Sequence, residues 1–371
     1  MKPYFNQLIP NIRPAFLLVF LTTLMCFPVL SQETGRLFIH LKNGLYGFAD
    51  ARGKVVIKPQ FYIVEEFSEG LARVAICAKE GTLRWAFIDR TGSIVIKLHF
   101  PETAAFSEGF AAVTDDKSRL GFIDRTGSYI IPPQFSSIII SENRFSEGLA
   151  AVQFQDKHGY IDKTGKFVIK PEFDYASPFS EGLADVKIGD KWGFMDKKGE
   201  FVIKPQFDRA DEFSEGLAGV NIGYVYALND QDPKYRKGKW GYIDKTGEVV
   251  IPVRYDFVNS FSEGLAVVGV DGKYGFIDRS GKLVIDTRFD YAEPFSDGLA
   301  AVEVDDKWGY IDKAGQMVIA PQFKEAYSFL DGIAWVYVDP FNAGRINKAG
   351  KYVWRTYEKK RGAFASKPCP R

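Results

Sequence analysis

Apolar and polar residues alternate over short segments along most of this chain, and the helical period is absent. In segment 201–207, Phe201, Ile203 and Phe207 fall on one face of an extended strand, whereas Lys204 falls on the other. Residues typical of turns, such as the D-K-T-G and K-K-G stretches, separate these segments. The pattern predicts an all-β protein made of short strands.

A motif recurs along the chain, an aromatic residue followed by glycine, a second aromatic residue and I-D-[KR]-x-G. The basic spacing of its copies is 34 residues, with insertions in some of them. This regular spacing predicts a tandem repeat rather than a single large core. Eight copies and a ninth, degraded one begin at Tyr46, Trp85, Leu120, His158, Trp192, Trp240, Tyr274, Trp308 and Ala343.

Each unit is predicted to hold three strands. In residues 183–207 these are LADVKIG, WGFMD and EFVIKPQF, joined by the turns GDK and KKG. The Asp and Gly of the second turn fit a type I turn with a bulge. A proline near the end of the third strand cannot donate a ladder hydrogen bond, so it ends pairing or lies on an edge. It occurs as Pro59, Pro133, Pro171, Pro205 and Pro321.

The sequence F-S-E-G, or a close variant, follows the third strand of eight units, first at Phe67–Gly70 and last at Phe329–Gly332. Ser, an acid and Gly suit a tight turn, and the Phe can anchor that turn in the core. A catalytic serine would not need eight copies, so the motif is interpreted as structural. The glycine between the two aromatic residues is interpreted likewise, as a point where a neighbouring side chain or the backbone packs closely. Stacked exposed aromatic rings could instead bind sugars.

The combination W-G-[YF]-I-D-K-x-G-x-x-V-I-x-P-x-F and F-S-E-G-L-A-x-V resembles the WG-repeat family of bacterial proteins. The resemblance covers residues 37–357 and departs at Ala86, Leu120 and His158, and most strongly in the ninth copy. It implies a tandem β-repeat array that serves as a binding or interaction module, without established catalytic residues.

Nine units could remain an open, solenoid-like array or close into a propeller-like ring. The open array is favoured because propellers usually have fewer than nine blades, and each of their blades has four strands rather than three. The chain also begins with a first strand and ends with a third strand, so no spare strand would interlock the ends. Ala343, Arg345 and Asn347 replace the aromatic residues of the last unit, and we expect them to form a solvent-facing cap.

Residues 1–31 resemble a secretory signal peptide, because an apolar run from Ala15 to Leu30 precedes small residues at a possible cleavage site before Gln32. The alternative is an uncleaved anchor. Residues 32–357 would then hold nine repeats, and residues 358–371 a basic, disordered tail. We expect an exported protein in the periplasm, at the cell surface or outside the cell. Cys77 and Cys369 remain after cleavage, as a disulfide or, preferably, as two free thiols.

The chain has 48 basic and 47 acidic residues, which argues against a nucleic-acid partner. No metal-ligand spacing, cofactor motif or nucleophile–base set is present, so no enzyme activity, cofactor or metal is expected. Basic residues at one set of turns and acids at the F-S-E-G turns predict two charged rows. These are solvated turns or, alternatively, include a basic ridge for an anionic envelope polymer.

Residues 221–239 interrupt the repeat between the fifth and sixth copies of the aromatic–Gly motif and lengthen the first hairpin of that unit. Tyr224, Tyr226, Tyr235 and Arg236 are the candidate partner-binding residues, since these residue types are enriched at interaction hot spots. The alternative is a tolerated surface insertion.

The sequence therefore predicts an exported, non-enzymatic scaffold that binds a protein partner. The alternatives are binding to a cell-envelope glycan through exposed aromatic rings, and a structural spacer. Exposure of Trp192, Trp240 and Trp308 would separate the first two, since buried rings cannot stack on a glycan.

Overall fold

The computed structural model describes residues 35–42, 44–77, 82–97, 100–136, 140–225, 236–339 and 342–355. The expected signal peptide, the basic tail, and Tyr226 and Tyr235 lie outside these ranges. Within them, no helix is long and apolar enough to cross a membrane.

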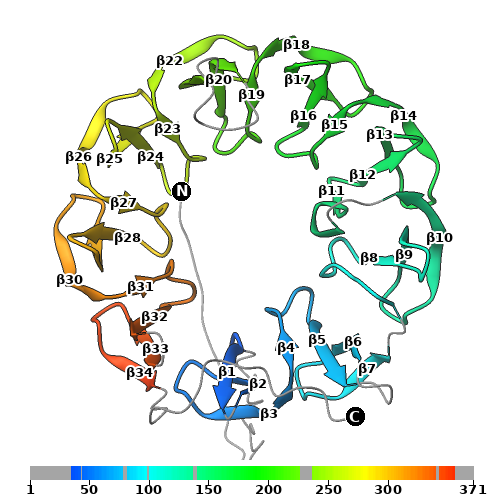
Figure 1. Ribbon diagram of the computed structural model, residues 1–371, viewed down its shortest axis with the longest axis horizontal. Coiled ribbons are helices and arrows are strands. Elements are labelled where there is room, and N and C mark those ends of the chain that lie inside the picture. The colour runs from blue at the N-terminus through cyan, green and yellow to red at the C-terminus, as the bar shows by residue number, and fades with distance from the viewer. Residues whose placement is uncertain are drawn as a thin grey trace, which may run out of the picture. The chain divides into compact units, whose positions relative to one another are not determined.

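Nine antiparallel three-stranded units account for nearly all of the described chain (Figure 1). The first strands are β1 (Phe38–Lys42), β5 (Ala72–Cys77), β8 (Ala111–Thr114), β12 (Leu149–Phe154), β16 (Leu183–Ile188), β20 (Ala218–Val225), β24 (Leu265–Val270), β28 (Leu299–Val304) and β32 (Ile333–Asp339). The second strands are β2 (Leu45–Ala49), β6 (Leu83–Ile88), β9 (Arg119–Ile123), β13 (Lys157–Ile161), β17 (Lys191–Asp196), β21 (Arg236–Ile243), β25 (Lys273–Asp278), β29 (Lys307–Asp312) and β33 (Asn342–Asn347). The third strands are β3 (Val55–Phe61), β7 (Ile94–Lys97), β10 (Tyr129–Ser136), β14 (Phe167–Phe173), β18 (Phe201–Phe207), β22 (Val249–Tyr255), β26 (Leu283–Phe289), β30 (Met317–Phe323) and β34 (Tyr352–Arg355). The all-β class and the three-stranded repeat are confirmed.

A two-residue strand that the sequence pattern did not reveal links most consecutive units. In unit 5, β15 follows β14 of the preceding unit and pairs with β16 through Tyr175–Lys187 and Ala176–Val186. Most sheets are therefore four-stranded, and each takes one edge from the preceding unit. The short strands are β4 (Ile63–Val64), β11 (Phe145–Ser146), β15 (Tyr175–Ala176), β19 (Arg209–Ala210), β23 (Phe257–Val258), β27 (Tyr291–Ala292) and β31 (Glu325–Ala326), and a 3-10 turn, η1, spans Ile140–Glu142.

The third strand of each unit is an edge strand in most sheets, as the proline predicted. In β18, Ile203 and Phe207 are buried and Lys204 is exposed, whereas Phe201 is exposed despite its phase. The pairing of β17 with β18 shifts register beside Pro205. At this bulge a Cβ on Gly193 would lie 2.6 Å from the carbonyl oxygen of Ile203. The glycine is required because the backbone of the neighbouring strand occupies its Cβ position.

The F-S-E-G turns tie each unit to the next. In the first of them, Glu69 and Gly70 both have positive φ, and Ser68 and Leu71 exchange backbone hydrogen bonds, which is a type I′ hairpin turn. The Ser68 hydroxyl donates to the carbonyl of Phe106 in the next such turn at 2.7 Å. The Glu69 carboxylate accepts the N–H of Gly109 at 3.0 Å. The same two bonds recur along the array, so the structural interpretation of this motif is confirmed.

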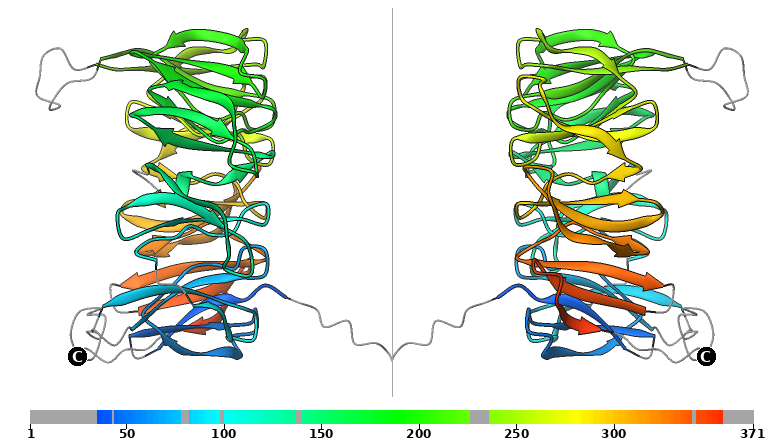
Figure 2. Two further views of the ribbon diagram at one scale, coloured as in Figure 1. Left: turned by 90° about the vertical axis from the view of Figure 1, so that its right-hand side faces the viewer. Right: turned by 90° about the vertical axis from the view of Figure 1, so that its left-hand side faces the viewer.

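The apolar cores lie between neighbouring units. One core combines Tyr160, Ile169 and Phe173 from unit 4 with Val186 and Met195 from unit 5. Comparable clusters repeat along the array. A unit therefore buries its large residues only against a neighbour, which is the stabilisation expected of a tandem repeat. The sheets follow one another in chain order (Figures 1 and 2).

No described strand of the last unit pairs with the first sheet, so the hydrogen-bonded array is open, as predicted. Side chains nevertheless join the two ends. Arg345 donates to the carbonyl of Ile39 and lies 4.9 Å from the Phe38 ring centre, and Arg36 bonds Asp331 at 3.5 Å. The expected solvent-facing cap is wrong. Ala343 and Arg345 are buried, because unit 1 covers them.

We expect Arg345→Met to destabilise the protein by about 2 kcal/mol, because the variant keeps the bulk but loses the carbonyl hydrogen bond and the cation–π contacts. Lys348→Ala, at an exposed position of the same unit, is the control. Thermal unfolding gives the stability, and hydrogen exchange of β1 should accelerate only in the Arg345 variant. Unchanged exchange in β1 would show that the contact does not hold the two ends together.

Candidate functional site

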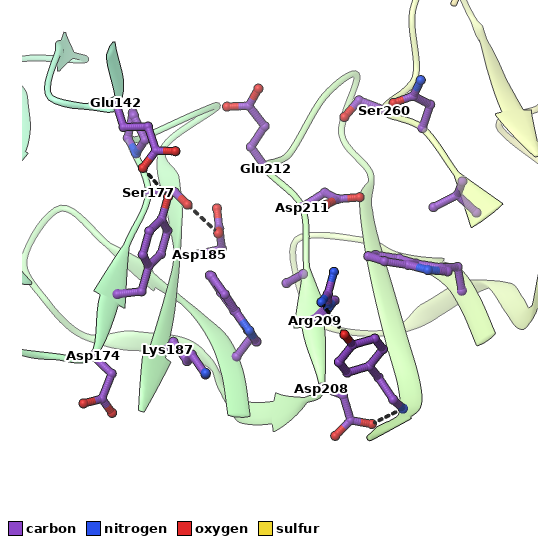
Figure 3. A pocket seen from close by; sticks show the side chains of 18 of the residues that line it. Glu142, Asp174, Ser177, Asp185, Lys187, Asp208, Arg209, Asp211, Glu212 and Ser260 are labelled. Atoms are coloured by element: carbon purple, nitrogen blue, oxygen red, sulfur yellow. Dashed lines mark hydrogen bonds between the residues drawn. The ribbon is translucent and has the colours of Figure 1, made fainter. Parts of the chain in front are cut away.

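A cleft of about 1400 Å³ opens where units 5 and 6 adjoin (Figure 3). Its walls come from β15, β16 and β17 on one side and from β19, β20, β21 and β23 on the other. Short strands bring the residues before each F-S-E-G turn into the cleft, and the second strands supply tryptophans. The cleft therefore gathers repeat-equivalent positions of successive units.

Asp185 of β16 is the most deeply buried carboxylate in the cleft, with 3% of its surface exposed. The Ser177 hydroxyl donates to its Oδ2 at 2.6 Å, and its Oδ1 has no hydrogen-bond partner. Burial raises the pKa of Asp185 to about 7, against the lowering effect of the Ser177 bond. Nearby Asp211 and Glu212 raise that pKa further, so the cleft holds negative charge with little compensation.

Asp211 and Glu212 precede the F-S-E-G turn of unit 6 and line the same cleft. Burial, with the neighbouring Glu212 charge, raises the pKa of Asp211 to about 6 against the lowering effect of Arg209. Gly219 makes room for this side chain, since a Cβ there would lie 2.9 Å from Asp211 Oδ2. No described cation lies within salt-bridge distance of Asp211 or Glu212. In Figure 3 both side chains stand across the cleft from Asp185.

Aromatic rings form much of the remaining wall. Trp192 and Tyr175 lie 5.4 Å apart between ring centres, and both are half-buried. The Tyr175 hydroxyl donates to Glu142 at 2.6 Å. Trp240 and Phe257, also half-buried, line the other side. Carboxylates beside aromatic faces form an environment that suits a cationic group.

Of the four candidate residues from the sequence, Tyr224 lines this cleft. Its hydroxyl accepts a bond from Arg209 at 2.7 Å, and the guanidinium of Arg209 lies 4.0 Å from its ring centre. Arg236 belongs to β21 and pairs with Val225, so the insertion begins by extending the hairpin. For Arg236 the structure describes this backbone pairing alone, and Tyr226 and Tyr235 lie outside the described residues.

The sequence analysis missed Asp185 and Asp211, although a signal was present. Asp185 is the third residue of L-A-x-V, and Asp211 stands two residues before the Phe of F-S-E-G. In the units that follow an F-S-E-G turn, these two positions lie opposite each other next to the start of the first strand. In most units the backbone N–H of the residue two before the Phe of F-S-E-G donates to the backbone carbonyl of the third residue of L-A-x-V. The pairs are Glu65–Arg73, Ala104–Ala112, Ser177–Asp185, Asp211–Gly219, Asn259–Val267, Glu293–Ala301 and Tyr327–Trp335.

The two predicted charged rows pair with each other, so the basic-ridge hypothesis is wrong for much of its length. Lys197 contacts Glu147 at 2.7 Å, and equivalent pairs follow at other units. The geometry brings four of the turn lysines onto an acid of an earlier F-S-E-G turn. The further pairs are Lys163–Glu108, Lys245–Glu181 and Lys313–Glu263.

The Asp of the I-D-K-x-G turn accepts backbone N–H groups of its own turn. Asp89 Oδ1 receives bonds from Thr91 and Ser93, and the Thr91 hydrogen bonds lower its pKa despite partial desolvation. Turn capping therefore accounts for these acids, as predicted. Among the described residues, no group of three or more His, Cys, Asp or Glu side chains could hold a metal ion.

Comparison with known proteins connects the repeat to a family. A family model described as the WG containing repeat matches residues 46–76, 85–117, 121–157, 159–192, 192–226, 240–274, 274–308 and 308–339. No curated protein matches the chain.

Among solved structures, a eukaryotic initiation factor is similar over 86% of this chain and 95% of its own, at 11% identity and a TM-score of 0.59. BamB from Moraxella catarrhalis matches over 81% of this chain and 92% of its own, at 11% identity and a TM-score of 0.41. Sqt1 from Saccharomyces cerevisiae matches over 68% and 83%, at 9% identity and a TM-score of 0.41. The first likeness concerns the fold alone.

Proposed function

Because this chain belongs to the family of proteins built from the WG containing repeat, we propose that it is an exported, non-enzymatic scaffold that binds a protein partner. The cleft between units 5 and 6 is the observation that carries this proposal. Its lining differs from the repeat at several positions and brings aromatic side chains together with acids. Among these acids, Asp185, Asp211 and Glu212 have no salt bridge in the described part of the chain. Aromatic residues are typical anchors of protein interfaces.

A binding role fits the cleft better than catalysis. The raised pKa values of Asp185 and Asp211 are the one feature that resembles an active site. However, Ser177 occupies Oδ2 of Asp185, and Oδ1 is inaccessible to solvent. A general acid or base must be within hydrogen-bond reach of its substrate. Asp185 therefore acts through its charge.

The alternative partner is an envelope glycan. Trp192, Trp240 and Trp308 are each half-buried, so the burial of these rings does not exclude the glycan alternative. Trp192 and Trp308 each pack against a tyrosine, at 5.4 and 5.7 Å between ring centres. This packing leaves less free ring face, and we favour a protein partner for that reason.

Export is supported by cysteine chemistry as well as by the N-terminal sequence. Cys77 is disulfide-bonded, so the preference for free thiols is wrong for this residue. Disulfides persist in oxidising compartments. We expect the native protein to begin near Gln32, which leaves Cys369 as the only other cysteine of the chain. N-terminal sequencing and a non-reducing peptide map test this. Intact Met1 in the cytosol, or a linkage to Cys26, would contradict it.

Trimming residues 226–235 to a short turn should leave folding intact, because β20 and β21 keep their pairing. A pull-down from envelope extracts with the mature chain would identify a partner, and its affinity for both forms can then be measured. We expect binding to survive trimming. A loss of at least tenfold, about 1.4 kcal/mol, would assign the contact to the insertion instead. Failure to recover any protein with the full chain would reject the scaffold proposal.

A further inference from the structure

We propose that the cleft between units 5 and 6 receives an arginine side chain of the partner protein. This inference rests on the proposed scaffold function and names the chemistry of the group that the cleft recognises. It is argued from the charge of the cleft, from one unsatisfied carboxylate oxygen, and from an arginine site that the chain builds for itself in another unit.

The lining of the cleft is strongly acidic. Seven of the lining residues are Asp or Glu, and three are Lys or Arg. Asp174 and Asp208 are already paired, with Lys157 at 2.5 Å and Lys191 at 2.6 Å. Arg209 stacks on Tyr224. The negative charge of Asp185, Asp211 and Glu212 is left without an adjacent salt-bridge partner in the described part of the chain.

Asp185 supplies an observation independent of this charge count. Its side chain is more than nine-tenths buried, lines the cleft, and leaves Oδ1 without a hydrogen-bond donor. A buried acceptor without a donor costs free energy, and a buried charge costs more. A cation entering the cleft beside Asp185 would offset the cost of the buried charge.

Unit 2 shows that a guanidinium fits beside the tryptophan of this repeat. Arg73 occupies the place equivalent to Asp185, and Glu65 occupies the place equivalent to Ser177. The guanidinium of Arg73 forms a salt bridge with Glu65 and lies 4.3 Å from the ring centre of Trp85, the equivalent of Trp192. In unit 2 the chain therefore places its own guanidinium between a carboxylate and a tryptophan. In unit 5 the tryptophan is present, Ser177 stands at the position of Glu65, and the Asp185 carboxylate takes the place of the Arg73 guanidinium.

A guanidinium suits the cleft better than an ammonium. Its planar face stacks on an aromatic ring while its edge donates to carboxylates on two sides. Trp192 and Trp240 supply such faces, Asp211 and Glu212 supply acceptors, and Asp185 of the neighbouring unit adds negative charge. A lysine would satisfy the charge but would use the aromatic walls less.

The test uses the mature chain and three fluorescent peptides of alternating glycine with arginine, lysine or citrulline, measured by anisotropy at about 0.15 M salt, where weak surface attraction is screened. We expect the arginine peptide to bind most tightly and the neutral citrulline peptide not to bind. Asp185→Ala and Asp211→Asn should each weaken the arginine peptide at least tenfold. Ala104 and Ala112 occupy the equivalent pair in another unit, so the repeat accommodates alanine at this position.

Glu293→Gln is the matched control, since Glu293 stands at the position equivalent to Asp211 but outside the cleft. Equal binding of the arginine peptide by the Asp185→Ala and wild-type chains, or equal binding of citrulline and arginine peptides, would overturn the inference. Displacement of the arginine peptide by a neutral oligosaccharide would assign the cleft to a glycan instead. If a protein captured by the wild-type chain is also captured by Asp185→Ala, the scaffold proposal stands and the arginine inference fails.

Discussion

Gly241→Val should destabilise the protein by more than about 2 kcal/mol, because the strand next to Gly241 leaves no space for a side chain. A Cβ at this position would lie 2.5 Å from the carbonyl oxygen of Ile251 and 2.8 Å from Val253 Cα. Both contacts are with backbone, which cannot move aside as a side chain can. Chemical denaturation of wild type and variant measures the loss.

Gly189→Asn provides the control for this substitution. Gly189 lies in an exposed hairpin turn with φ of 60°, and nothing lies within 4 Å of a Cβ placed there. Asparagine tolerates this backbone conformation, so little change in stability is expected. An unchanged denaturation midpoint for Gly241→Val would show that the strands separate at this point without cost.

Asp185→Asn should stabilise the protein at alkaline pH by as much as about 4 kcal/mol, since the folded state raises the pKa of Asp185 from 3.8 to about 7. The native state binds the proton more tightly than the unfolded state does. Stability from this group is therefore fully present below about pH 4 and is lost as pH rises through 7. Asparagine carries no charge and keeps the shape, so its advantage should appear over that window and be absent below it.

Asp244→Asn should instead destabilise the protein near neutral pH, and this loss of stability should disappear on acidification. Hydrogen bonds from Thr246 lower the pKa of Asp244 in its turn, so that its contribution is present near neutral pH and is lost on acidification. Urea denaturation of both variants between pH 4 and 8 tests the pair. If Asp185→Asn brings no gain at pH 8, Asp185 is not held as a buried charge in the folded protein.

Local patterns in the sequence sufficed for the repeat itself. Strand alternation, the glycine between two aromatic residues and the turn chemistry of I-D-K-x-G act over a few residues, and all three are confirmed. Their recurrence at 34 residues was enough to predict an all-β array of three-stranded units. The two-residue strands escaped prediction, because two residues such as Tyr175 and Ala176 carry no periodic signal.

The contacts between units depended on the tertiary structure. Arg345 looked like a polar cap residue, yet unit 1 buries it, because the curvature accumulated over nine units brings the two ends together. The sequence predicted a ridge of basic turn residues. Each lysine–glutamate pair depends, however, on which earlier F-S-E-G turn the curvature brings near the lysine. The candidate site also depends on contacts between units. Asp185 and Asp211 stand 26 residues apart in ordinary repeat positions, and only the packing of units 5 and 6 places their charges in one cleft. The sequence by itself determined the unit, and the geometry between units, which no local pattern encodes, determined the site.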